Sequence, residues 1–205
     1  MVRRYSRKKQ TKSKRPFNMR RRAYRKPVTT YIKRTVTLMS TSGVDATPDF
    51  GSGLTFKLSD LPNYTEMSNL FDRFTIKKVD YRWYIEQDPN NQTVKKFPIV
   101  SWAHSFTTVT APTALTDIQQ YPSYRKVMFR EDRPMTKLYS IRPAISQVNY
   151  LSGVSSGYVA KWNEFVNTSD SGTPFYGLKI WYDNLQTGVT LNLECTFHIQ
   201  LRGIK

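Results

Sequence analysis

The clearest pattern in the chain is a strict alternation near its C-terminus. Every odd position between 189 and 201 is apolar, counting Cys195, and every even position between 190 and 202 is polar or charged. A period of two is typical of a β-strand with one buried face. The pattern therefore predicts a long strand over residues 189–202.

Shorter stretches predict the rest of a β-rich domain. Residues 97–106 are apolar on both parities, which favours a strand covered on both faces. Gly, Pro and Ser predict loops over 42–52, 107–123 and 147–173, and residues 131–134 predict a compact hairpin turn. The predicted strands are 32–38, 54–58, 79–86, 97–106, 126–130, 137–145, 175–182 and 189–202.

One segment predicts an amphipathic helix. Asn63 and Glu66, three residues apart, have the form of a capping box. Apolar residues then follow at the spacing of one helical face, namely Met67, Leu70, Phe71 and Phe74. We expect a short helix packed against a sheet, and one further helical turn around 115–119.

Eight strands, loops of unequal length and little helix predict an all-β fold. A parallel α/β fold would need helices between the strands, and an up-and-down barrel would have short turns throughout. We therefore expect an eight-stranded antiparallel jelly roll, a two-sheet sandwich, with its strand order left open.

Charge divides the chain into two parts. Residues 3–34 contain 15 Lys and Arg and no acid, because the first acid is Asp45. The other 17 Lys and Arg are nearly balanced by all 15 Asp and Glu, so most of the net charge of +17 lies at the N-terminus. Such a block is expected to be disordered when free. We predict a basic nucleic-acid-binding and nuclear-import arm over 1–30 and the jelly-roll domain over 31–205.

The expected ligand of the arm is a polyanion. Tyr5, Phe17 and Tyr24 can stack on unpaired bases, which favours single-stranded nucleic acid. No basic zipper or zinc finger is present, so we expect binding that ignores sequence and weakens steeply with salt. Two narrower uses stay open: a nuclear-import signal alone, at 7–15 or 20–26, or a targeting segment. The candidate phosphate-binding residues are Arg3, Arg4, Arg7, Lys8, Lys9, Lys12, Lys14, Arg15, Arg20, Arg21, Arg22, Arg25 and Lys26.

The sequence carries no constellation that predicts catalysis. His104 and His198 fall on different predicted strands, and Cys195 takes an apolar parity, so neither a zinc site nor a disulfide is expected. His104 is predicted to be buried and hydrogen-bonded, and His198 to lie on a surface face. We expect no enzyme, no metal, no cofactor and no insertion into a membrane.

Residues 58–83, LSDLPNYTEMSNLFDRFTIKKVDYRW, resemble a segment of the capsid proteins of circovirus-like viruses, whose circular single-stranded DNA encodes a replication initiator. The resemblance implies a jelly roll that self-assembles into a small icosahedral shell of T=1 size, with the arm on the DNA genome. It also implies host nuclear-import machinery and a host receptor as partners, and location in the virion and the host nucleus. Leu61, Pro62, Asn63 and Tyr64 are candidates for a subunit contact, with docking inside one subunit as the alternative.

A different class of protein competes with this interpretation. A monomeric or dimeric nucleic-acid-binding module, such as a ribosomal or chromatin protein with a basic tail, has a similar charge layout. It predicts a small particle at any salt concentration.

Overall fold

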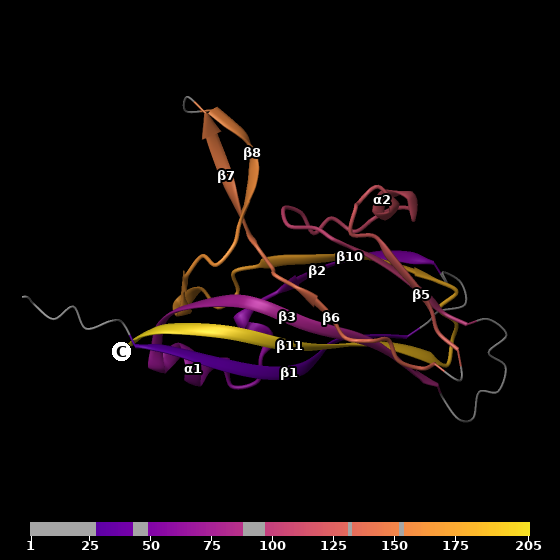
Figure 1. Ribbon diagram of the computed structural model, residues 1–205, viewed down its shortest axis with the longest axis horizontal. Coiled ribbons are helices and arrows are strands. Elements are labelled where there is room, and N and C mark those ends of the chain that lie inside the picture. The colour runs from indigo at the N-terminus through magenta and orange to yellow at the C-terminus, as the bar shows by residue number, and fades with distance from the viewer. Residues whose placement is uncertain (1–27, 43–48, 88–96, 131–132, 152–153) are drawn as a thin grey trace, which may run out of the picture.

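The structure is a computed structural model that describes residues 28–42, 49–87, 97–130, 133–151 and 154–205. Strands make up most of it, and the helices are short (Figure 1). The strands are β1 (Thr29–Ser42), β2 (Phe50–Phe56), β3 (Phe71–Gln87), β4 (Ile99–His104), β5 (Arg125–Met128), β6 (Tyr139–Ile141), β7 (Ile145–Leu151), β8 (Val154–Lys161), β9 (Val166–Asn167), β10 (Phe175–Asp183) and β11 (Val189–Ile204). The helices are α1 (Tyr64–Leu70), α2 (Thr116–Gln119) and the 3₁₀ turns Leu58–Asp60 and Thr168–Asp170.

Two antiparallel sheets form the body. The first sheet has the order β1-β11-β3-β6, with β9 also paired to β3, and the second has the order β2-β10-β4-β5. They form two layers, and a separate hairpin of β7 and β8 rises away from both (Figure 1). If the eight strands of the main paths are numbered along the chain, the orders are 1-8-3-6 and 2-7-4-5, which is the jelly-roll arrangement. The predicted eight-stranded jelly roll is confirmed.

The core between the sheets is rich in aromatic rings. Trp83 and Trp102 are fully buried with ring centroids 6.2 Å apart, and Tyr81 lies edge-on to Trp102 at 6.4 Å. The Trp102 indole N–H donates to the Tyr81 hydroxyl at 2.9 Å, so the polar ends of both side chains are satisfied without water. The odd positions of β11 complete this core, as the alternation predicted.

The helix predicted after Asn63 is present but ends early, because β3 takes its second half. Phe71 pairs with Ile204 and Phe74 with Leu201 of β11, and a long antiparallel ladder outweighs the helical spacing of two apolar residues. The capping box is wrong as well. Asn63 adopts a left-handed φ of 62°, and its side chain makes no capping hydrogen bond.

The predicted hairpin at residues 131–134 is also wrong. β5 pairs with β4 in the second sheet, whereas β6 pairs with β3 in the first sheet, so the connection crosses from one layer to the other. One antiparallel bridge, between Arg130 and Arg133, remains at the turn, and residues 131–132 lie outside the described residues.

The predicted loop over 147–173 requires the largest correction. It contains β9 and most of the β7–β8 hairpin, in which Ile145 pairs with Lys161. The hairpin has no core face to impose alternation, and its Ser and Gly residues masked its strands in the sequence. By contrast, β4 is covered on both faces as predicted, and α2 lies where a helical turn was expected. β2 begins at Phe50, which lies inside the predicted loop over 42–52. Residues 43–48 of that loop lie outside the described ranges.

Candidate nucleic-acid interface and shell surfaces

The arm joins the body at the start of an edge strand. Its candidate phosphate-binding residues, and Tyr5, Phe17 and Tyr24, lie outside the described residues, which begin at Val28. β1 pairs only with β11 among the described strands, and its first residue, Thr29, lies opposite Arg202. The described chain therefore enters β1 beside the end of β11, close to the C-terminus (Figure 1).

Positive charge continues from this point onto the outer face of the first sheet. The odd positions of β11 point into the core, so its even positions and their register partners point outward. On that face Arg202 lies opposite Arg73, and His198 lies between Lys33 and Lys78. We call Lys33, Arg73, Lys78 and Arg202 the basic face. Lys33, Arg73 and Arg202 can extend phosphate contacts from the arm to the body, whereas Lys78 is already paired with Asp80.

Cations crowd one another next to the basic face. The Arg202 guanidinium lies 3.9 Å from the ring centroid of Phe165, and the Lys77 ammonium lies 5.4 Å from the same ring. Burial lowers the pKa of Lys77, and the positive charges of Arg202 and Arg142 lower it further. A bound anion would offset this repulsion.

Asp80 anchors a polar cluster one register row further along. Its carboxylate lies 2.8 Å from the Lys78 ammonium and 2.8 Å from the His198 imidazole, and it accepts a hydrogen bond from Ser140 of β6. Burial raises the pKa of Asp80, but the hydrogen bonds from Lys78, Ser140 and His198 outweigh it and hold that pKa below its ordinary value of 3.8. The cluster therefore ties β3, β6 and β11 together when Asp80 is ionised.

Replacing Asp80 by Asn should lower the free energy of unfolding at neutral pH by about 1–2 kcal/mol, because an amide loses the charge-assisted bonds. A depressed folded-state pKa gives stability that is present above about pH 4 and is lost as pH falls through the folded pKa. Urea unfolding should therefore show a large difference between the two proteins at pH 7 and a smaller one near pH 3. The control is Glu194→Gln, which breaks the more exposed pair with Arg82 at 2.9 Å and should cost less than about 1 kcal/mol. An Asp80→Asn effect that is equal at both pH values would contradict this account.

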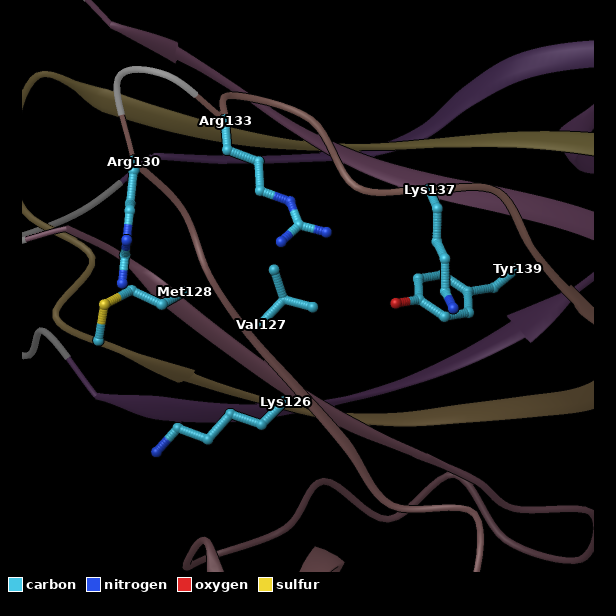
Figure 2. A pocket seen from close by; sticks show the side chains of 7 residues that line it. All are labelled: Lys126, Val127, Met128, Arg130, Arg133, Lys137 and Tyr139. Carbon is cyan, nitrogen blue, oxygen red and sulfur yellow. The ribbon is translucent and has the colours of Figure 1, made fainter.

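A second basic site lies between the edge strands of the two sheets. It is a cavity of about 530 Å³ lined by Lys126, Val127, Met128, Arg130, Arg133, Lys137 and Tyr139. Among the described residues, the lining contains four cations and no carboxylate. Figure 2 shows the Arg133 guanidinium pointing toward Val127 and the Lys137 side chain lying along the Tyr139 ring. Such a lining suits an oxyanion, such as a phosphate or sulfate group.

The Tyr139 ring in this cavity is not a platform for a base. The Lys137 ammonium lies 5.4 Å from its centroid, and the Arg125 guanidinium lies 5.3 Å from it. The Tyr81 ring also stacks on it, with centroids 5.8 Å apart. Cations and a core ring therefore already occupy the neighbourhood in which a base would stack.

The side chains of the candidate subunit contact, Leu61 to Tyr64, lie partly in the core and partly on the surface. Leu61 is 2% exposed and packs in the chain's own core, which fixes the segment in place. Pro62 and Asn63 are exposed, and Tyr64 is 37% exposed at the start of α1. Three of the four side chains are therefore on the surface, and their contact with another subunit stays a prediction.

The two histidines and the cysteine lie in surroundings that serve the fold. His104 lies 3.3 Å from the Tyr81 hydroxyl, and burial, aided by the charge of Arg125, lowers its pKa. His198 lies on the outer face, as predicted. Cys195 is fully buried, and burial raises its pKa. Within the described residues, no group of three His, Cys, Asp or Glu side chains is placed to hold a metal ion. No helix in that part of the chain has the length and hydropathy needed to cross a membrane.

Comparison of the sequence with models of known protein families identifies the family of this chain. The family model of the circovirus capsid protein matches residues 2–205, which includes the arm and the whole body. The chain belongs to this family. It is therefore a viral capsid protein, a structural component of the virion, and the resemblance seen in residues 58–83 is confirmed.

Solved structures agree on the fold of this capsid chain. The BFDV capsid protein in a 60-mer crystal structure superposes with a TM-score of 0.57 at 14% identity, covering 86% of this chain and 94% of that one. The decameric BFDV form gives 0.52 at 14% identity, with coverages of 87% and 100%. Cucumber Necrosis Virus gives 0.56 at 9% identity, with coverages of 86% and 57%. A search of curated protein sequences finds no match. At such identities the structural likeness shows the fold alone.

The two basic sites of the body were missed by reasoning from the sequence. Lys33 and Arg202 occupy polar positions of predicted alternating strands, so the sequence indicated that they face outward. It did not show that they share one face of one sheet, because that depends on the order β1-β11-β3.

Proposed function

We propose that this capsid chain self-assembles into a T=1 icosahedral shell of sixty copies and packages a circular single-stranded DNA genome through its N-terminal arm. The proposal is supported by one observation: the chain combines a capsid-type jelly roll with a cationic arm. A jelly roll of the circovirus capsid family begins at β1, and an acid-free cationic arm runs directly into that strand.

The body has the form that a shell needs. Both sheets end in edge strands, β1 and β6 in the first and β2 and β5 in the second. Unpaired edges are a liability for a free protein, but contacts between copies can cover them in a shell. The BFDV capsid protein, which has the same fold, forms a 60-mer, and this supports sixty copies here.

The arm has the charge to neutralise a long strand. Sixty copies, each with the candidate cations between Arg3 and Lys26, would bring on the order of 800 positive charges into one cavity. Each nucleotide of single-stranded DNA carries one negative charge, so this number matches a strand of many hundreds of nucleotides. The basic face beside the start of β1 adds cations on the body itself.

The same arm is proposed to direct the chain to the host nucleus. The clusters at 7–15 and 20–26 are short and dense enough for the import machinery, and they lie outside the described residues. A host receptor is a further proposed partner and would meet the outside of the shell.

The experiment that tests the proposal is a count of subunits. Full-length recombinant protein should form uniform spherical particles in electron microscopy, with a mass of sixty copies by light scattering. Particles of one or two subunits under every assembly condition would contradict the proposal and favour the alternative, a small nucleic-acid-binding module.

A further inference from the structure

The β7–β8 hairpin projects from the body as a separate two-stranded sheet. Its strands pair with each other, from Ile145 opposite Lys161 to Leu151 opposite Val154, and with no other described strand. Figure 1 shows it rising away from both layers of the sandwich. A lone two-stranded hairpin is marginally stable in water, and packing against another surface stabilises such a hairpin.

The base of the hairpin is fixed on both legs. Ahead of β7, Ala144 and Tyr176 of β10 exchange two backbone hydrogen bonds, of 2.7 and 3.3 Å. After β8, the Trp162 ring packs edge-on against Phe106, with centroids 5.6 Å apart. The hairpin is therefore a projection with a set direction and not a loose loop.

Apolar side chains are exposed along β8 and directly after it. Tyr158 is 66% exposed, Val159 41% and Trp162 47%. Two grooves flank the base of the hairpin. One, of about 450 Å³, is lined by residues 107–110, Tyr158 and Tyr176, and the other, of about 470 Å³, by residues 104–107, 121–123 and Ala160. Exposed aromatic rings beside grooves are typical of contact surfaces.

The low charge of the hairpin does not favour a polyanion as the partner. Lys161 is the one charged residue in the sequence of 145–161, although the chain carries a net charge of +17. Depletion of charge with Tyr and Val exposed is typical of the core of a protein interface. It is also the surface at which two copies of a strongly positive chain can approach with little repulsion.

We propose that the β7–β8 hairpin is an interface that docks on a second copy of this chain. This inference rests on the proposed function, because a shell presents a neighbouring copy at one fixed angle to every subunit. The anchored hairpin then meets the same patch of its neighbour throughout the shell. Tyr158 and Trp162 carry the contact, and the free edges of β7 and β8 offer backbone hydrogen bonds to the neighbour.

The first test places a photoreactive benzoylphenylalanine at position 158 of the full-length chain. Irradiation of assembled shells should give covalent dimers linked through that position, whereas dissociated subunits should give none. Shells that form without cross-linked dimers, or that cross-link only to a co-purified host protein, would overturn the hairpin interface and leave the proposed function standing. If the wild-type chain forms no shell, the proposed function fails and the interface fails with it.

The second test compares two exposed apolar positions. Tyr158→Ser should raise the subunit concentration needed for half-maximal assembly by about tenfold or more, as expected for an aromatic at the centre of an interface. Ile204→Ser, at a side chain that is 61% exposed at the end of β11, an inner strand of the first sheet, should change it by less than about threefold. Circular dichroism of the dissociated subunits checks that both variants fold. Equal effects of the two substitutions, or no effect of Tyr158→Ser, would overturn the proposal.

Discussion

Deleting residues 2–26 should leave a folded, soluble body that no longer retains nucleic acid. The deletion removes every candidate arm cation and ends before Thr29, where β1 begins, so the ladder with β11 is untouched. The 260/280 nm absorbance ratio of the purified protein should fall to that of protein alone, while its far-ultraviolet circular dichroism keeps the β-sheet spectrum. Unchanged nucleic-acid content would contradict the role of the arm.

A matched control separates charge from length in this prediction. Changing the same Lys and Arg residues to Gln keeps the arm but removes its charge, and it should have the effect of the deletion. For the wild-type chain, about 13 engaged cations predict a slope of roughly −9 in a plot of log affinity for single-stranded DNA against log salt. A Gln-substituted arm that still binds with a steep slope would place the binding on the basic face of the body.

Replacing Trp102 by Ala should lower the free energy of unfolding by about 3–5 kcal/mol, a large share of the total for one domain. The side chain is fully buried among Trp83, Tyr81 and Tyr139, so its removal leaves a cavity between the sheets. It also leaves the Tyr81 hydroxyl without the indole donor. Urea unfolding of dissociated subunits, followed by circular dichroism, measures the loss.

The control for Trp102 is Trp162→Ala, at a ring that is 47% exposed. It removes a side chain of the same size and should cost less than about 1 kcal/mol in the dissociated subunit, since most of the cavity term is absent. Equal losses at the two positions would contradict a core centred between the two sheets.

The sequence predicts the fold best where one face of a strand is buried. The alternation predicted β11 from Val189 to Arg202, and the strand runs on to Ile204; a core on one side requires the alternation. The same logic fails at Lys77, where a bulge lets Ile76 pair with Ile199 and Lys78 with His198. The bulge shifts the parity of the strand, so the residues before it looked like part of a helix. Only the pairing with β11 shows that they are strand.

Features that depend on several strands at once escape such reasoning. The basic face requires the order of the first sheet, and the basic cavity requires that β5 and β6 belong to different sheets. The β7–β8 hairpin escaped for a different reason, because a strand pair whose partner is another molecule carries no core pattern in its own sequence. The charge of the arm, in contrast, is a property of composition and was evident from the start.

Nuclease treatment of full-length particles tests the central claim most directly. Particles purified from the expressing cells are digested, sized by electron microscopy, and measured for absorbance at 260 and 280 nm. Uniform spherical shells that still hold protected, single-stranded nucleic acid are the expected result, because the arms would lie inside with the strand. Particles of one or two subunits whose nucleic acid is fully digested, under several assembly conditions, would contradict the account.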